Sequence, residues 1–124
     1  DKLRRLLDDI DSPNVAALWD VNHPYRYFGE SAQTTWDNVG KYVRHMHLKD
    51  SVMQDGRARY AILGYGDLPL EQIIETTQKA GYEGFYSLEW LKRWRPELRD
   101  PDVIFYHFQT YMETLLAEIE SDEK

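Results

Sequence analysis

The chain has 124 residues, a length that fits one ordinary domain and excludes a second independent domain. Hydrophobic residues make up 42% and charged residues 30%, which is typical of a folded protein, and the net charge of -7 disfavours nucleic acid and anionic membranes as partners. The absence of cysteine excludes disulfides and thiol chemistry and fits a cytoplasmic protein, and no apolar run approaches the roughly 18 residues of a membrane helix.

Strand and helix patterns alternate along the chain. In chain order they are a helix over residues 3–10, a strand over 15–19, a helix over 31–40, a strand over 42–48, a helix over 67–81, a strand over 85–90 and a helix from 100 onward. The strand segments are rich in β-branched and aromatic residues, whereas the helix segments place apolar residues three and four positions apart. Ser31 is of the type that starts a helix, and Gly40 is of the type that ends one in a left-handed turn.

This order of elements predicts an α/β fold. Parallel strands cannot be joined by a tight hairpin, so each connection is expected to cross over through a helix. Each predicted strand is apolar on both faces, as expected where helices cover one side and a barrel interior or a second helix layer covers the other. The longest connection, residues 50–68, contains three glycines and is too long for a simple turn, so we expect it to be functional or mobile.

Polar residues fall near the ends of all three predicted strands. Asp20 follows the first strand, His47 lies near the end of the second and Glu89 near the end of the third. Because side chains alternate along a strand, all three can point inward at one rim, and Lys49 can join them from the same face as His47. Carboxylate and imidazole groups are ligands for hard or borderline divalent ions. The sequence therefore predicts a metal site at the carboxyl ends of the strands, where α/β enzymes bind ligands.

Each of these residues also has an ordinary structural interpretation. An aspartate at a strand end often caps a turn, and a histidine in a strand is often a hydrogen-bonded core residue. Glu89 is harder to explain in this way, because a carboxylate in an apolar segment must be paired, hydrated or coordinated. The equivalent positions of the three residues on successive strands favour the metal interpretation.

Four short segments occur in an order that is more specific than any one of them. They are WDVNHP at 19–24, HMHLKD at 45–50, GYGDLP at 64–69 and SLEW at 87–90. Together they resemble the last strands of the xylose-isomerase-like TIM barrels, and within these the sugar phosphate isomerase/epimerase group. The resemblance implies a partial TIM (β/α)8 barrel of about three parallel strands with flanking helices, the sixth to eighth of the family barrel. Residues 1–124 would be a single C-terminal portion, because a complete barrel takes roughly 250 residues.

The resemblance also assigns roles to site residues. Family members hold one divalent ion, which can be Mn, Mg, Co or Zn, with a glutamate, an aspartate, a histidine and a second glutamate. The last three map onto Asp20, His47 and Glu89, and the first is expected on a strand before Asp20. Glu89 would also act as a catalytic acid/base, and His23, three residues after the aspartate, would contact the substrate. Lys49 is our candidate for a further substrate contact at the rim. An arginine that some ketose 3-epimerases place six residues after the ligand histidine is Met53 here, which disfavours that subgroup.

The expected function is that of a metal-dependent isomerase or epimerase of carbohydrate metabolism. It would act on a sugar, sugar phosphate or inosose by proton transfer next to a carbonyl. We expect the isolated chain to be inactive, and either an N-terminal barrel portion or self-association to complete its sheet. One alternative is a noncatalytic fragment or binding module with a relic metal site. Another is an apurinic endonuclease, disfavoured by the acidic charge and by the lack of a histidine between His47 and His107.

Overall fold

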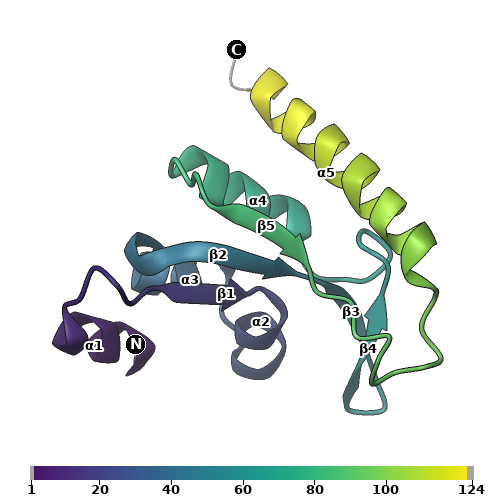
Figure 1. Cartoon of the computed structure of the whole chain (residues 1–124), viewed down its shortest axis with the longest axis horizontal. Coiled ribbons are helices and arrows are strands. Elements are labelled where there is room, and N and C mark those ends of the chain that lie inside the picture. The colour runs from purple at the N-terminus through teal and green to yellow at the C-terminus, as the bar shows by residue number, and fades with distance from the viewer. Residues whose placement is uncertain (1, 123–124) are drawn as a thin grey trace.

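The computed structural model describes residues 2–122, which form an α/β arrangement with two separate sheets (Figure 1). In chain order the elements are α1 (Lys2–Ile10), β1 (Ala17–Asp20), α2 (Asn22–Phe28), α3 (Ala32–Val39), a 3-10 turn (Gly40–Tyr42), β2 (Val43–Leu48), β3 (Asp50–Gln54), β4 (Arg57–Ala61), α4 (Leu70–Lys79), β5 (Phe85–Leu88) and α5 (Pro101–Asp122). Within these described residues, no helix is both long enough and apolar enough to cross a membrane.

The larger sheet confirms the predicted parallel strands. Its order is β1-β2-β5, and both pairings are parallel. Asp20 pairs with His47, and His47 pairs in turn with Ser87 of β5. The carboxyl ends of the three strands therefore meet at one edge of the sheet.

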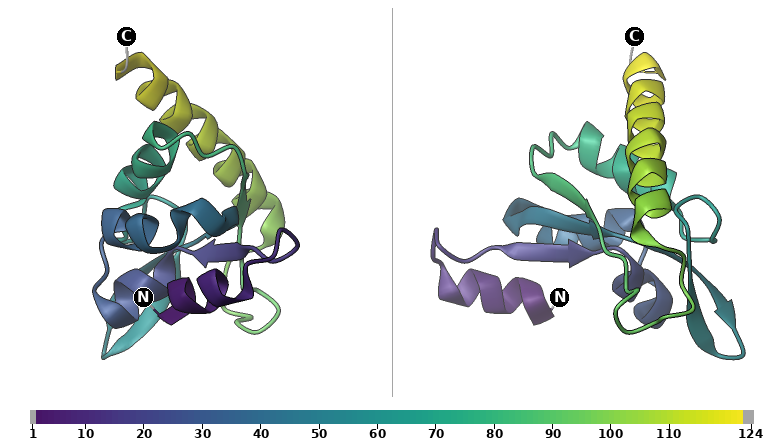
Figure 2. Two further views of the ribbon diagram at one scale, coloured as in Figure 1. Left: turned by 90° about the vertical axis from the view of Figure 1, so that its left-hand side faces the viewer. Right: turned by 45° about the vertical axis from the view of Figure 1, so that its right-hand side comes forward.

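Helices cover one face of this sheet. Trp19 and Met46 project from it into a core that includes Ile73 and Ile74 of α4, and all four side chains are buried. Figure 1 shows α3 and α4 behind the sheet, and Figure 2 shows α5 running alongside α4. Trp90 belongs to the strand predicted over 85–90 but lies beyond the end of β5, and its indole nitrogen donates to the Arg99 carbonyl at 2.9 Å.

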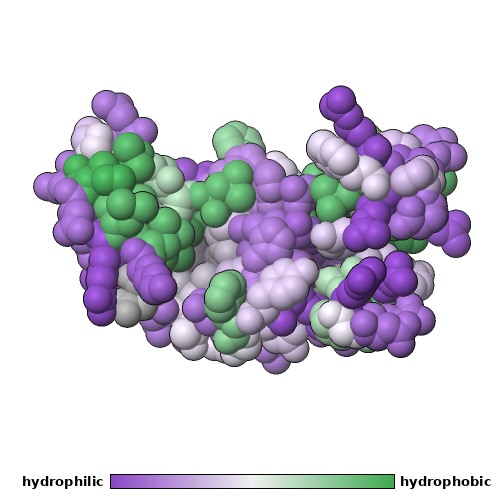
Figure 3. Space-filling model, turned by 90° about the horizontal axis from the view of Figure 1, so that it is seen from below, coloured by the Kyte–Doolittle hydropathy of each residue, from purple (hydrophilic) through white to green (hydrophobic). Residues whose placement is uncertain are grey.

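The opposite face of the sheet is open. Leu18 is 49% exposed and Phe85 is 75% exposed, as the strand alternation predicts. Simple alternation from His45 and His47 would place Val43 on this open face as well, but Val43 is buried, because the register between β1 and β2 shifts between Ala17 and Leu18. The apolar surface continues onto α1, where Figure 3 shows hydrophobic side chains gathered at that end of the molecule; the exposed ones include Leu3, Leu6 and Ile10.

A hairpin of two strands and a short helix were not predicted. The long connection of residues 50–68 is mostly the antiparallel hairpin β3–β4, which extends from the carboxyl ends of the parallel strands (Figure 1). Asp55 and Gly56 at its tip have φ angles of 51° and 71°, the left-handed pair typical of a tight hairpin turn. The other unexpected element is the seven-residue helix α2, which begins two residues after Asp20.

Of the two helix-end signals at α3, Ser31 is confirmed and Gly40 is not. The Ser31 hydroxyl accepts a hydrogen bond from the Thr34 amide and caps α3, as predicted. Gly40 has a right-handed conformation, so the predicted left-handed turn is wrong. A Cβ atom at this position would lie 2.6 Å from the Trp36 ring, so close packing with that ring is what requires the glycine.

Candidate metal centre

Asp20, His47 and Glu89 converge at the carboxyl edge of the parallel sheet. Asp20 is the last residue of β1, His47 lies one residue before the end of β2, and Glu89 follows β5 directly. The Glu89 amide donates to the Leu48 carbonyl at 2.9 Å, which continues the strand pairing through the glutamate. One potential ligand atom from each of the three side chains lies within 4.8 Å of the others. The structure thus brings together the three residues predicted as metal ligands.

Asp20 is held by the first turn of α2. Its Oδ1 atom accepts hydrogen bonds from the amides of Asn22 at 2.9 Å and His23 at 3.4 Å. The His23 ring lies beside the same oxygen, with Nδ1 at 3.8 Å, and its side chain is 53% exposed. The backbone amides of α2 therefore fix the orientation of Asp20, and the helix places His23 at the solvent-exposed mouth of the site.

Lys49 lies inside the cluster, with a side chain that is only 4% exposed. Its Nζ atom is 2.6 Å from Asp20 Oδ2 and also donates to Glu89 Oε2. Glu89 turns its other oxygen, Oε1, toward His47 Nδ1 at 3.7 Å. Burial alone would lower the pKa of Lys49, but the hydrogen bonds to the two carboxylates outweigh it and raise that pKa, so the ammonium is charged at neutral pH.

This donor set suits a hard or borderline divalent ion. Two carboxylates and one imidazole supply oxygen and nitrogen ligands, and the chain has no cysteine to favour a soft metal. The ligands come from three adjacent strands, which fix their backbones relative to one another. His47 and Glu89 side chains are each 30% exposed, so an ion and a substrate can reach them from solvent.

A wide hollow opens next to Asp20 and His23. Its volume is about 560 Å³, and it lies along the β1 edge of the sheet, where its walls include Leu3 of α1, Leu18 of β1, Phe28 of α2 and Val39 of α3. Asp20 is the candidate ligand that lines this hollow, and the rest of the lining combines apolar side chains with the polar Lys2, Glu30, Thr35 and Asn38.

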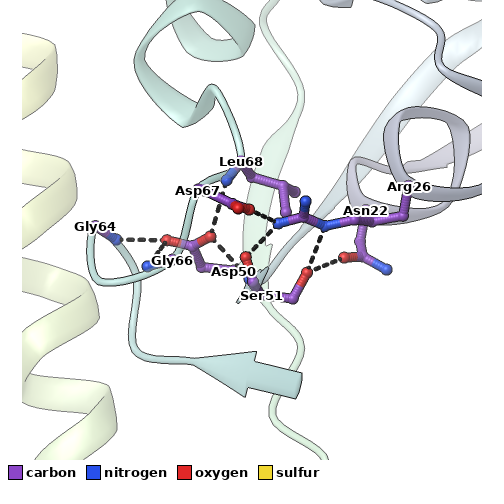
Figure 4. Close-up of polar contacts among 8 residues, drawn as sticks. All are labelled: Asn22, Arg26, Asp50, Ser51, Gly64, Gly66, Asp67 and Leu68. Atoms are coloured by element: carbon purple, nitrogen blue, oxygen red, sulfur yellow. Dashed lines mark hydrogen bonds and ion pairs between the residues drawn. The ribbon is translucent and has the colours of Figure 1, made fainter. Parts of the chain in front are cut away.

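A second, buried polar network supports this edge of the sheet (Figure 4). Asp50 is 1% exposed, and its carboxylate accepts four backbone amides: Ser51 at 2.8 Å, Gly64 at 3.0 Å, Gly66 at 2.8 Å and Leu68 at 3.3 Å. A Cβ atom at Gly66 would collide with this carboxylate, so glycine is required there. One side chain thereby fixes the segment that joins the hairpin to α4.

Arg26 ties α2 to the same network. Its Nε donates to Ser51 Oγ at 2.9 Å, and its terminal nitrogen contacts both the Ser51 carbonyl and the Asp67 carboxylate (Figure 4). Ser51 Oγ donates in turn to Asn22 Oδ1 at 2.7 Å. Because Asn22 and Asp50 are chain neighbours of the site residues, the network holds the backbone on which those residues stand.

Sequence reasoning missed Arg26 and Asp50. Arg26 gives no signal of its role along the chain, because its partners lie 25 and 41 residues away. The role of Asp50 had two signals in the sequence. A carboxylate directly after an apolar strand needs hydrogen-bond partners, and Gly64 and Gly66 mark a segment whose backbone approaches another group closely.

Comparisons with known proteins agree with the fold. Fructoselysine 3-epimerase of Escherichia coli O157:H7 is 30% identical over 91 residues, which cover 73% of this chain and 32% of the epimerase. Inosose dehydratase of Geobacillus thermodenitrificans is 26% identical over 104 residues, which cover 72% of this chain and 35% of the dehydratase. The crystal structure of a xylose isomerase domain protein from Planctomyces limnophilus matches 98% of this chain and 43% of its own, with a TM-score of 0.70 and 22% identity.

The chain thus corresponds to part of a barrel. It spans 32% and 35% of the length of the two curated relatives and 43% of the solved structure. Its three parallel strands with flanking helices are the fold class expected from the sequence. The family model described as xylose isomerase-like TIM barrel matches residues 1–105, and the chain belongs to that family.

Proposed function

We propose that this chain is the C-terminal, metal-binding portion of a divalent-metal-dependent sugar isomerase or epimerase. The observation that carries the proposal is the convergence of Asp20, His47 and Glu89 at the carboxyl edge of three parallel strands, with ligand atoms within 4.8 Å of one another. Enzymes of this architecture draw their catalytic residues from several strand ends at that edge.

In this proposal the three residues hold one divalent ion, which can be Mn, Mg, Co or Zn. The bound ion would polarise the substrate carbonyl and so acidify the neighbouring C–H bond. Glu89 takes and returns the proton, since its carboxylate reaches the centre from β5 and stays partly exposed. His23, at the mouth, contacts a substrate hydroxyl. Lys49 is also proposed as a substrate contact, and because its ammonium contacts two carboxylates, it would have to leave one of them to bind substrate.

The substrate class rests on the relatives. An enzyme named for fructoselysine and one named for inosose both favour a polyhydroxylated carbonyl compound as the small-molecule substrate here. An endonuclease with three zinc ions is disfavoured, because residues 2–122 contain one group of three clustered metal-ligating side chains and the chain carries a net charge of -7.

The proposal predicts stoichiometric metal binding. Metal-stripped full-length gene product should bind one Mn²⁺ per chain in a calorimetric titration. His47→Ala removes a direct ligand and should weaken this binding by more than about a hundredfold, because loss of even an outer partner of a metal ligand typically costs tenfold to a hundredfold. His107→Ala is the matched control, because His107 is a histidine of α5 whose ring nitrogen contacts the Leu63 carbonyl and which lies outside the cluster. Equal binding by wild type and His47→Ala would remove the metal site from the proposal.

Catalysis is proposed for the complete protein. A second acid/base glutamate is expected from the resemblance on an earlier strand, and Glu89 alone serves only one side of the substrate carbon. Residues 1–124 are therefore proposed to be one C-terminal unit that is inactive when isolated.

We expect the isolated chain to self-associate through its open sheet face. Phe85 and Leu18 expose apolar surface there, and exposed edges of a sheet invite pairing with another chain. Light scattering should show dimers or larger species, and Phe85→Glu should shift them toward monomer. Val103→Glu on α5 is the control, since Val103 is also exposed but lies away from the sheet. A monomer at all concentrations contradicts the prediction.

A further inference from the structure

Lys49 is a charged residue in an unusual position. Lysine is rarely buried without partners, and here a side chain that is 4% exposed places its ammonium between two carboxylates from different strands. Those carboxylates, Asp20 and Glu89, are the two anionic members of the candidate metal centre. The same ammonium also lies over the Tyr60 ring of the hairpin, with the ring centroid 5.7 Å from Nζ.

Lys49 contacts one oxygen atom of each carboxylate and leaves the other oxygen free for other partners. It takes Oδ2 of Asp20 and Oε2 of Glu89, while Asp20 Oδ1 is bound to the α2 amides and Glu89 Oε1 faces His47. Without the ammonium, two like charges would face each other across the strand edge and repel. Lys49 therefore holds the two carboxylates together when no metal is bound.

The same ammonium reduces the net negative charge of the site at which a metal ion would bind. Asp20 and Glu89 contribute two negative charges, and Lys49 cancels one of them at hydrogen-bond distance. It also repels any second cation that the same carboxylates bind. Attraction of a divalent ion is thereby weaker than the carboxylates alone would provide.

We propose that the positive charge of Lys49 holds the ligands Asp20 and Glu89 in place when no metal is bound, and that it lowers the affinity of the centre for divalent metal. This inference rests on the proposed metal-binding function and adds to it a control of affinity. The site would be kept preformed yet would exchange its ion readily, so that occupancy follows the supply of metal.

The test is a comparison of Mn²⁺ affinity in the metal-stripped full-length gene product, measured by isothermal titration calorimetry at neutral pH. Even with the screening of bulk water, loss of one adjacent positive charge should tighten divalent binding by about tenfold. Lys49→Met is expected to show this gain, and Lys49→Arg, which keeps the charge, should stay close to wild type. Lys79→Met is the matched control, because Lys79 is an exposed lysine that pairs with Glu75 on α4.

Melting curves give a second readout. Without metal, Lys49→Met should melt below wild type because Asp20 and Glu89 repel, and saturating Mn²⁺ should raise its melting temperature more than it raises that of wild type. Lys49→Gln, which keeps a hydrogen-bond donor without charge, serves for the same comparisons if the methionine variant does not fold.

The outcomes separate this inference from the proposed function. Mn²⁺ binding by wild type with equal or weaker binding by Lys49→Met overturns the role of Lys49 and leaves the metal centre standing. Binding by Lys49→Met and not by wild type supports the role of Lys49 in its strongest form. Failure of both proteins to bind overturns both proposals.

Discussion

Replacing Glu89 with glutamine should lower the turnover of the full-length protein by about 10²–10⁴-fold, the range that a positioned acid/base group contributes. Glutamine keeps the size of the side chain, but its amide cannot take a proton from carbon. It also replaces a charged metal ligand with a neutral one, and it removes one of the two anions that hold Lys49. The measurement is steady-state kinetics with Mn²⁺ on a panel of ketoses and inososes, together with exchange of substrate protons into deuterated solvent followed by NMR.

The control for this variant is Glu97→Gln. Glu97 is an exposed carboxylate that pairs with Arg95 at 3.9 Å on the segment after β5, so its loss should leave turnover unchanged. A calorimetric Mn²⁺ titration separates the two roles of Glu89, because a variant that keeps the ion but loses proton exchange has lost only the acid/base group. Full activity of Glu89→Gln would show that the proposed role of Glu89 is wrong.

The convergence of Asp20, His47 and Glu89 could be predicted because it depends on two strong regularities. Strand side chains alternate with a period of two, and adjacent parallel strands end at one edge, so residues in the same phase near three strand ends are brought together. Neither regularity needs knowledge of long-range packing. The helix-covered positions of Trp19 and Met46 follow from the same alternation.

The parts that were missed depend on irregular backbone and on distant partners. The buried position of Val43 results from a register shift between β1 and β2, which reverses the alternation at the start of a strand. The hairpin β3–β4 had a local signal in Asp55-Gly56, but the glycines that follow it favoured reading the whole connection as a loop. The bridge from Lys49 to Glu89 joins residues 40 positions apart, and no spacing along the chain encodes it.

Loss of the Asp50 carboxylate should produce the largest change in stability. Asp50→Ala removes the shared acceptor of four backbone amides, of which those of Ser51 and Leu68 belong to buried residues, whereas Gly64 is exposed and Gly66 is half-buried. Each stranded buried donor costs about 1–3 kcal/mol, and partial entry of water will offset some of this, so we expect a loss of about 3–5 kcal/mol in the free energy of unfolding. Urea denaturation of the full-length protein measures it.

Asp37→Ala provides the comparison for this prediction. Asp37 is an exposed carboxylate on α3 that accepts a hydrogen bond from Gln33, so its removal should change the free energy of unfolding by no more than about 0.5 kcal/mol. Asp50→Asn should fall between the two, since its single carbonyl oxygen can keep some of the four amides. Hydrogen exchange at Gly64 and Gly66 should accelerate in Asp50→Ala well before global unfolding, because those amides lose their acceptor while the parallel sheet stays paired. If Asp50→Ala is as stable as Asp37→Ala and its Gly64 amide stays protected, the 64–68 segment is held by other contacts, and the carboxylate is not what fixes the backbone beside Lys49.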